Sequence, residues 1–424
     1  MTKFCVVLIF CLSLFGATSC FAVPEGGGAT HAQVKLVTQY QSIRPGAEFL
    51  AGLHFVLEEG WHLYWRNPGD SGLPLKAKWR LPSGFTAGEV EWPYPAIFRV
   101  EHLADYGYAG EVLLPLRIKS PLLHEYGKTV EIGVELEWVI CKSTCIPGKA
   151  SLSSSLSIVE EGAGAKSASY DLFVSALERL PIRGDALHHE AQARGKEILL
   201  YSESGPGHEL PGKPGRFFPY QPGLISAAAP QVLEQKGAGY ALRLQRTSAG
   251  NLPAKLEGVL VYDAATGGGR PAAYEVAARL EADAGDAVVE PQDDVVAKAS
   301  PDGLPWEKFS RERLRSLLNQ GVPVLIKFHA DWCPACQVNQ ARLYKSPEIR
   351  SMLLQRRVTL LSADWTKRDP VIAETINSYG QAGLPLVVYY PGYGAPAVIL
   401  PGIIEPEAFK RIIEGGTRSK PRTI

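Results

Sequence analysis

Residues 322–336 constrain the fold of this 424-residue chain more than any other stretch. Val322 begins an apolar run long enough for a buried strand, which leads through Asp331-Trp332 straight into Cys333-Pro-Ala-Cys336. The residues that follow, 337–344, can form a helix. Cys333 would then lie at a helix N-terminus, where free N–H groups and the helix macrodipole favour a thiolate. A thiolate attacks disulfides and a second cysteine resolves the mixed disulfide, so this stretch predicts a redox site.

Residues 1–22 have the pattern of a secretory signal peptide, with Lys3, an apolar run over 4–15 and small residues up to Ala22. We expect cleavage after Ala22. The alternative is a lipobox, Ala17-Thr-Ser-Cys20, in which Cys20 is lipidated and anchors the exported protein. Either interpretation places the mature chain in the periplasm.

Four of the seven cysteines lie beyond the signal, in two close pairs, Cys141/Cys145 and Cys333/Cys336. Structural disulfides usually join residues distant in sequence, because closing a long loop constrains the unfolded chain more. Two short-range pairs in an exported protein therefore indicate redox chemistry. The alternatives are a static bridge and a metal site shared by the four thiols. A zinc site at Cys141/Cys145 would need further ligands at short spacing, and none appear, so we expect no metal site.

Length and composition limit the other possibilities. A chain of 424 residues predicts about three domains. Its 44 Lys and Arg balance 44 Asp and Glu with no basic stripe, so nucleic-acid binding has no support. No later stretch reaches about 18 uninterrupted apolar residues, and we expect no transmembrane span.

Residues 30–160 show a β pattern. Residues 130–138 alternate strictly between apolar and polar, so this strand should bury one face, and it leads directly to Cys141. Further strand-like runs at 34–36, 49–57 and 112–118, separated by Pro and Gly turns, predict an all-β sandwich.

Residues 165–282 predict a connecting helix over 167–180 and then a second β-rich domain, with strands at 197–201, 240–244 and 259–263. This domain has no cysteine, and its histidines lack metal-ligand spacing, so we interpret it as a spacer. Residues 283–303 are polar and alanine-rich and are interrupted by prolines, which is typical of a linker.

Residues 304–418 predict an α/β domain around the Cys-x-x-Cys. An amphipathic helix over 305–320 precedes the redox stretch. The elements expected after it are a strand at 358–363, a helix at 370–379, strands at 386–390 and 397–400, and a helix at 405–414.

This order of elements and the motif Ala330-Asp-Trp-Cys-Pro-Ala-Cys336 resemble a thioredoxin-fold domain. Ala363-Asp-Trp-Thr-Lys-Arg-Asp-Pro370 and Gly383-Leu-Pro-Leu-Val-Val-Tyr-Tyr390 resemble the C-terminal domain of the DsbD family of thiol:disulfide interchange proteins. The resemblance implies a cis-proline at Pro385 beside the disulfide, and Trp332 packed against it.

Residues 61–70, 105–111 and 138–148 resemble the other periplasmic domain of that family, in the variant found in suppressor-of-copper-sensitivity B proteins. The resemblance implies an immunoglobulin-like domain whose pair, Cys141/Cys145, takes electrons from the thioredoxin-like domain and passes them to client proteins. A short loop caps this pair in the family, and Tyr106 and Tyr108 are assigned to it. Asp70, Asp105 and Glu111 are not interpreted as proton carriers.

The chain departs from the family in two ways. A linker of about twenty residues replaces the family's membrane domain, which implies a separate membrane electron donor of the DsbD or CcdA type. Lys327 stands where thioredoxins have a buried carboxylate, six residues before the first cysteine. A charged Lys327 near Cys336 would favour thiolate and a more oxidising pair.

The expected function is therefore a periplasmic protein-disulfide reductase whose catalytic residues are Cys333, Cys336, Cys141 and Cys145, with no cofactor beyond these disulfides and with periplasmic proteins as clients. A DsbA-like oxidant or isomerase is the second hypothesis. A potential near the ~−270 mV of thioredoxin would favour the first, and one near the ~−120 mV of DsbA the second. A non-enzymatic copper-binding or copper-tolerance protein is the third.

Overall fold

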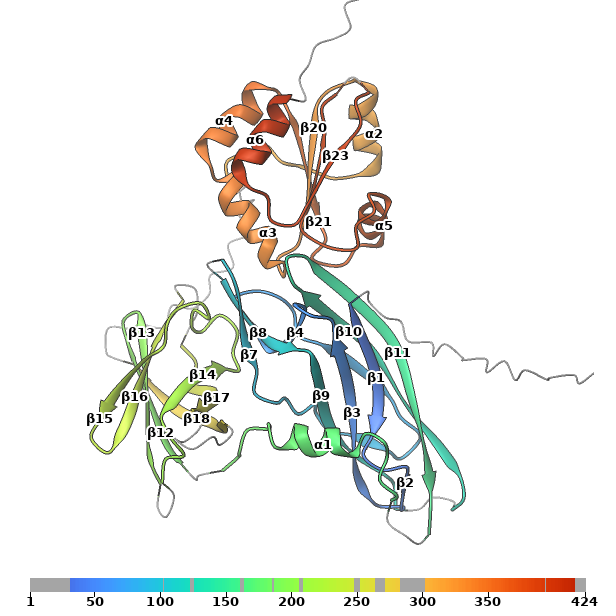
Figure 1. Cartoon of the computed structure of the whole chain (residues 1–424), viewed down its shortest axis with the longest axis vertical. Helices are drawn as coiled ribbons and strands as arrows, with labels where there is room; N and C mark the ends of the chain where they lie inside the picture. The colour runs from blue at the N-terminus through green and yellow to red at the C-terminus, as the bar shows by residue number, and fades with distance from the viewer. Residues whose placement is uncertain are drawn as a thin grey trace, which may run out of the picture.

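The computed structural model describes residues 31–415, apart from 102, 123–125, 161–163, 185–186, 206–208, 248–251, 264–270, 283–301 and 393. The predicted signal peptide, Cys20 and most of the predicted linker lie outside the described residues. Figure 1 shows three sheet-based parts, which we call the N-terminal domain (32–158), the middle domain (187–282) and the C-terminal domain (304–415). The C-terminal domain stands on the end of the N-terminal domain, and the middle domain lies at the side of the latter.

The N-terminal domain is a β-sandwich. One sheet has the order β1-β3-β9-β6, and the other has the order β2-β11-β10-β4-β8-β7, with β5 also paired to β10. Alternating residues of both sheets fill one core, as in β1, where every second side chain is buried. The strands are β1 (Ala32–Thr38), β2 (Ser42–Ile43), β3 (Glu48–Leu57), β4 (His62–Gly69), β5 (Lys76–Arg80), β6 (Thr86–Ala87), β7 (Ala96–Val100), β8 (Leu103–Ala109), β9 (Glu111–Lys119), β10 (Thr129–Cys141) and β11 (Cys145–Ile158).

Strands β10 and β11 form a long antiparallel hairpin whose tip carries the first cysteine pair. Pairing runs without a shift from Thr129 opposite Ser157 to Cys141 opposite Cys145. Figure 1 shows the tip of this hairpin directly beneath the C-terminal domain. The predicted strand over 130–138 is thus confirmed and continues to the first cysteine.

The middle domain is a seven-stranded sheet in the order β14-β17-β18-β12-β13-β16-β15. It is tied to the N-terminal domain through Asp70, whose carboxylate accepts hydrogen bonds from the amides of Ala227 and Ala228 at 2.9 and 3.0 Å. The helix α1 (Tyr170–Leu177) connects the two domains. The strands are β12 (Leu187–Arg194), β13 (Glu197–Ser204), β14 (Pro214–Pro219), β15 (Val232–Lys236), β16 (Gly239–Gln245), β17 (Lys255–Tyr262) and β18 (Ala272–Ala282).

The C-terminal domain has a five-stranded sheet, β19-β21-β20-β22-β23, in which β20 pairs parallel with β21 and antiparallel with β22. Helices cover the sheet on both sides (Figure 1). The elements are β19 (Glu307–Lys308), α2 (Arg311–Asn319), β20 (Val324–His329), α3 (Pro334–Asn339), the π-helix η1 (Gln340–Tyr344), α4 (Pro347–Gln355), β21 (Thr359–Asp364), α5 (Pro370–Ser378), β22 (Leu386–Tyr390), β23 (Val398–Pro401) and α6 (Pro406–Gly415).

One predicted helix boundary in this domain is wrong, and one helix was missed. The predicted helix over 305–320 begins only at Arg311, because Glu307 and Lys308 pair with β21 and the Ser310 hydroxyl caps the helix by accepting from the Arg313 amide at 3.1 Å. Helix α4 was not predicted, although Ser346 and Pro347 give it a cap and a first-turn proline.

The predicted fold class is confirmed: an N-terminal β-sandwich, a second β-rich domain and a C-terminal α/β domain of the thioredoxin type. Among the described residues, no helix is both long and apolar enough to cross a membrane.

Candidate redox site

Cys333 and Cys336 form a disulfide at the start of α3, where the chain leaves β20. Cys333 is the N-cap residue of α3, and its Sγ accepts a hydrogen bond from the Cys336 amide at 3.1 Å. Pro334 occupies the first turn of α3, where backbone N–H groups have no partner within the helix, so a residue that lacks an N–H costs no helical hydrogen bond. An amide pointed at Sγ favours the thiolate over the thiol once the pair is reduced. The local geometry therefore suits Cys333 as the nucleophile.

Trp332 packs beside this disulfide and is held by two partners. Its indole N–H donates to the Thr366 carbonyl at 3.1 Å, and its ring centroid lies 6.0 Å from that of Trp365. Trp365 in turn donates to the Asp369 carbonyl at 3.0 Å. These two contacts hold the Trp332 side chain in a fixed position next to Cys333.

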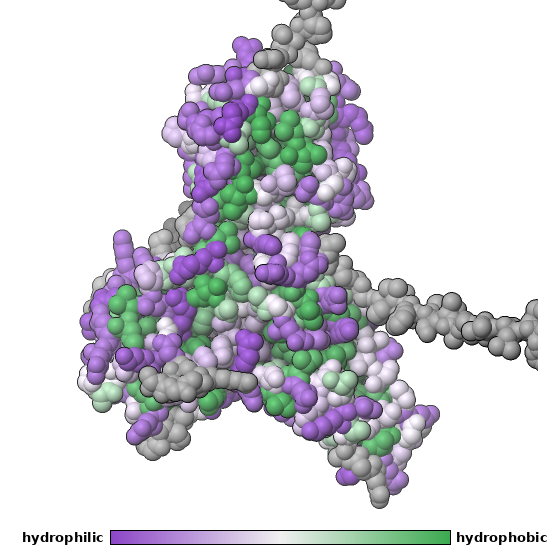
Figure 2. Space-filling view, in the orientation of Figure 1, coloured by the Kyte–Doolittle hydropathy of each residue, from purple (hydrophilic) through white to green (hydrophobic). Residues whose placement is uncertain are grey.

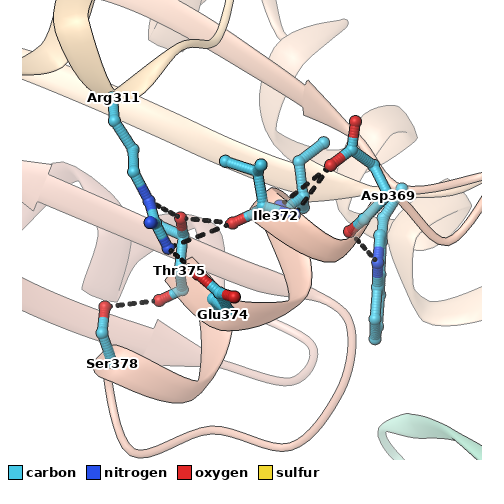
Figure 3. A network of polar contacts seen from close by, with 8 residues as sticks. Arg311, Asp369, Ile372, Glu374, Thr375 and Ser378 are labelled. Atoms are coloured by element: carbon cyan, nitrogen blue, oxygen red, sulfur yellow. Dashed lines mark hydrogen bonds and ion pairs between the residues drawn. The ribbon is translucent and has the colours of Figure 1, made fainter.

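Helix α5 is anchored at its start and along its length, and this also fixes Trp365, which is hydrogen-bonded to the N-cap residue Asp369. Figure 3 shows Asp369 capping the helix, with its carboxylate accepting from the Val371 amide at 2.8 Å, and Arg311 of α2 reaching across to α5. Arg311 donates to the Thr375 hydroxyl at 3.0 Å and to Glu374 at 3.1 Å. The contact ties α2 and α5 together behind the site.

The peptide bond between Leu384 and Pro385 is cis, as the family resemblance implied. Residue Leu384 makes a two-way backbone contact with the N-terminal domain. The Cys145 amide donates to the Leu384 carbonyl at 2.7 Å, and the Leu384 amide donates to the Cys145 carbonyl at 3.1 Å. The loop before Pro385 therefore forms an isolated antiparallel β-bridge with the second cysteine of the other pair.

Cys141 and Cys145 are also joined in a disulfide, at the tip of the β10–β11 hairpin. Both pairs belong to one apolar cluster that extends across the two domains. Cys145 and Cys333 have no exposed surface, Cys141 retains 1% and Cys336 retains 8%. The structure thus brings together the two cysteine pairs, which the sequence separates by almost two hundred residues, and covers them.

Two arginines of the C-terminal domain reach the N-terminal domain at the edge of this interface. Arg342 donates to Glu101 at 2.6 Å, and Arg368 approaches the Glu137 carboxylate at 3.5 Å and the Trp138 carbonyl at 3.4 Å. Figure 2 shows polar residues along this junction, with apolar patches above and below it. An apolar centre with a charged rim is the usual anatomy of a specific protein interface.

The assignment of Tyr106 and Tyr108 to a loop over Cys141/Cys145 is wrong. Both lie in strand β8, with their side chains buried in the sandwich core rather than in the cluster that holds the cysteines. The Tyr108 hydroxyl donates to the Pro93 carbonyl at 2.6 Å. In a strand, residues two apart share a face, and this face is opposite to the redox site.

Sequence reasoning missed the polar residues that do lie beside Cys145. The Tyr64 hydroxyl is 3.8 Å from Cys145 Sγ, and Asp105, which has no exposed surface, lies 3.5 Å from the same hydroxyl. In the sequence, the one hint of this polar site is an acidic residue, Asp105, inside a strand-like run. The pairing of β4 with β8, which brings Asp105 next to Tyr64, cannot be read from the sequence.

Lys327 does not stand as an isolated charge behind the site. Its Nζ lies 3.8 Å from the fully buried carboxylate of Asp302, 3.3 Å from Gln340 Oε1 and 3.9 Å from the centroid of the Trp306 ring. Burial lowers the pKa of Lys327 to about 8, and the attraction of Asp302 opposes that shift. Although burial alone would raise the pKa of Asp302, the Gln340 hydrogen bond, the Leu304 amide and Lys327 lower it below its ordinary value.

We expect Lys327 to titrate near pH 8 in the intact protein, being charged below that pH and neutral above it. Trace labelling with acetic anhydride across a pH series, read by peptide mass spectrometry, should show this midpoint. Asp302→Asn should lower the midpoint further, because it removes the attraction that favours the ammonium form. Lys410, whose two glutamate partners raise its pKa above 10.5, is the internal control. Equal midpoints for the two lysines would contradict the prediction.

No group of three or more His, Cys, Asp or Glu side chains within the described ranges could hold a metal ion.

Two family models match the chain. Residues 32–157 match the model described as thiol:disulfide interchange protein DsbD, N-terminal, and residues 305–392 match the model described as thioredoxin-like.

Among curated relatives, the thiol:disulfide interchange protein DsbD of Escherichia coli K12 is 27% identical over 92 residues, which are 21% of this chain and 16% of that protein. DsbD of Vibrio cholerae is 31% identical over 77 residues, 18% of this chain and 12% of that protein. The match thus spans less than a fifth of the length of either relative.

Among solved structures, the N-terminal periplasmic domain of ScsB from Proteus mirabilis is similar with a TM-score of 0.44 and 18% identity, covering 60% of this chain and 98% of that one. The two family matches hold the two cysteine pairs, one each. The chain is therefore similar to DsbD proteins in two separate parts, residues 32–157, which match the DsbD N-terminal model, and residues 305–392, which match the thioredoxin-like model.

Proposed function

We propose that this protein is a thiol–disulfide oxidoreductase that passes two electrons from Cys333/Cys336 to Cys141/Cys145 and then to client proteins. The Cys333 thiolate attacks Cys145 Sγ, so that the Cys333–Cys145 bond forms and the electron pair of the broken disulfide goes to Cys141. The Cys336 thiolate then attacks Cys333, and Cys145 leaves as a thiolate. The thioredoxin-like site ends oxidised, and the N-terminal pair ends as a dithiol after taking up two protons.

One observation carries this proposal: the β-bridge between Cys145 and Leu384, beside cis-Pro385. In this contact Cys145 lies against the loop that contains cis-Pro385, next to the Cys-x-x-Cys. A partner chain would have to lie in the same position for its disulfide to exchange with Cys333. The same contact leaves neither Cys333 nor Cys145 exposed, so exchange with a client or a donor requires the two domains to separate.

The remaining parts of the proposal follow from the chain's organisation. The signal-like start implies an exported protein that works in the periplasm, with Cys20 as a possible lipid anchor. Electrons would come from a separate membrane donor of the DsbD or CcdA type, and periplasmic proteins would be the clients. The two disulfides suffice as redox centres, without a further cofactor.

Trapping with Cys336→Ala tests the proposal. Because the resolving thiol is absent, the reduced Cys333 should remain bonded to its partner, and non-reducing peptide mapping should find Cys333 joined to Cys145 within one chain. Adding Cys145→Ala should abolish this species. Adding Cys141→Ala removes the disulfide that Cys333 attacks, so the Cys333–Cys145 bond should then form only when an external disulfide oxidant such as oxidised glutathione is supplied. A trapped chain that contains no Cys333–Cys145 bond would contradict the proposed relay.

The second candidate, a DsbA-like oxidant or isomerase, is favoured by the positive charge of Lys327. The nearby Asp302 carboxylate offsets much of that charge, which weakens the electrostatic case for an unusually oxidising pair. We therefore place protein-disulfide reduction first.

A further inference from the structure

A buried polar cluster lies on the same face of the N-terminal sheet as the cysteine pair. His62 and Tyr64 come from β4, Asp105 comes from β8, and Ser71 lies in the segment that follows β4. Their exposed fractions are 2%, 0%, 0% and 7%, respectively. Burying these groups is costly unless they are paired, so a cluster at this position requires an explanation beyond packing.

The Tyr64 hydroxyl lies between two acceptors. It is 3.5 Å from Asp105 Oδ2 and 3.8 Å from Cys145 Sγ, which are both long distances for the groups concerned. Its single proton can serve only one of them at a time. Ser71 donates to the other oxygen of Asp105 at 2.6 Å, so the carboxylate keeps a partner when Tyr64 turns toward the sulfur.

The ring of Tyr64 is held so that the hydroxyl stays beside Cys145. The His62 ring meets it edge-on at 5.2 Å, and a Cβ on Gly72 would lie 2.3 Å from the Tyr64 ring, so Gly72 packs directly against it. His62 itself stacks on Phe98 at 4.4 Å. These contacts keep the Tyr64 hydroxyl within reach of Cys145 Sγ.

The charges around the cluster are consistent with donation from Tyr64. Burial raises the pKa of Tyr64 well above its ordinary value, and the charge of Asp105 raises it further, so the hydroxyl keeps its proton. His62 Nε2 lies 3.5 Å from Asp105 Oδ2, the carboxylate oxygen that also faces the Tyr64 hydroxyl.

We propose that Tyr64 is a catalytic residue of the N-terminal site: its hydroxyl donates a hydrogen bond to Cys145 Sγ when this sulfur leaves as a thiolate. Asp105, Ser71 and His62 are positioning residues that act through Tyr64. The inference rests on the proposed function, because it concerns the step in which Cys336 attacks Cys333 and the Cys333–Cys145 bond breaks. The electron pair of that bond goes to Cys145, and a leaving thiol of lower pKa departs faster.

The test is the rate of Cys145 alkylation by iodoacetamide in the full chain with Cys141→Ala, Cys333→Ser and Cys336→Ser, so that Cys145 is the only thiol of the two pairs. In this background, Tyr64→Phe should slow alkylation at pH 7 about tenfold, because hydrogen bonds to charged groups are the strong ones. The pH midpoint of the reaction should rise accordingly. Phenylalanine keeps the ring in place, so the fold is preserved.

Tyr108→Phe is the matched control, because Tyr108 is equally buried in the neighbouring strand but donates to a backbone carbonyl on the opposite face. It should leave the rate unchanged. In an Asp105→Asn background, the effect of Tyr64→Phe should change, because Asp105 and Cys145 share the Tyr64 proton. Equal effects in the two backgrounds would show that Asp105 does not act through Tyr64.

The result separates this inference from the proposed function. If Cys336→Ala traps Cys333 on Cys145 but Tyr64→Phe leaves Cys145 alkylation unchanged, the role of Tyr64 is overturned and the relay stands. If no such bond is trapped, the relay fails, and the role of Tyr64 in it fails too.

Discussion

Replacing Gly383 by valine should separate the C-terminal domain from Cys145 without unfolding either domain. A Cβ at this position would lie 2.4 Å from the Cys145 carbonyl oxygen, 3.0 Å from Ile146 Cγ1 and 3.1 Å from the Cys145 carbonyl carbon. Real Cβ atoms essentially never come within 3.0 Å of another heavy atom. All three nearest atoms belong to the N-terminal domain, so the clash falls on the interface.

The expected loss is large because both hydrogen bonds of the β-bridge would break together. In the Cys336→Ala background, formation of the Cys333–Cys145 bond should slow by about a hundredfold, the effect of a misplacement of about 1 Å in a reacting pair. Reaction of reduced Cys333 with a small disulfide such as DTNB, which needs no backbone pairing, should instead become faster, since separation uncovers Cys333.

Gly415→Val is the matched control, because no heavy atom lies within 4 Å of a Cβ built there. It should change neither rate. If Gly383→Val left the internal exchange as fast as in the parent chain, the observed β-bridge would not be the route of exchange.

Removing the Trp138 side chain should cost the N-terminal domain about 3–5 kcal/mol, as for other fully buried aromatic residues replaced by alanine. Trp138 has no exposed surface, meets Phe55 edge-on at 5.5 Å and lies opposite Gly148 in the hairpin. A Cβ on Gly148 would come within 2.2 Å of the indole, so glycine is what lets the ring lie across β11. Alanine would leave a cavity beneath the strands that carry both cysteines.

Calorimetry of the full chain should show this loss as an earlier transition for the N-terminal domain, with that of the C-terminal domain unchanged. Trp79→Ala, at a half-buried position in the adjacent strand β5, should cost less. Equal losses for the two variants would show that Trp138 has no special place in the core.

Local patterns were enough to predict the main elements of this protein. Strict alternation over 130–138 identified β10, and the apolar run before Cys333 identified β20. A strand that buries one face alternates apolar and polar residues, and a strand that buries both faces is a continuous apolar run. The start of α2 was misplaced, because residues 307–308 have no β signal of their own and become a strand only by pairing with β21.

The candidate site was predictable to the same extent. Cys333, Cys336 and the proline at 385 stand in motifs that need no knowledge of the rest of the fold. The family resemblance assigned Tyr106 and Tyr108 to a capping loop, whereas they lie in strand β8 with their side chains in the sandwich core. Asp105 was not interpreted as a proton carrier, because nothing in the sequence places it beside Cys145.

The sequence by itself determined that two short-range cysteine pairs exist, that one begins a helix after a buried strand and that the other ends an alternating strand. Only the tertiary structure decided that Cys145 lies against Leu384, that Tyr64 and Asp105 lie beside Cys145, and that Asp302 meets Lys327. The physical reason is that thiolate chemistry and strand burial depend on near neighbours in the chain. Contacts between distant residues depend on how whole sheets pack, and no short pattern records that packing.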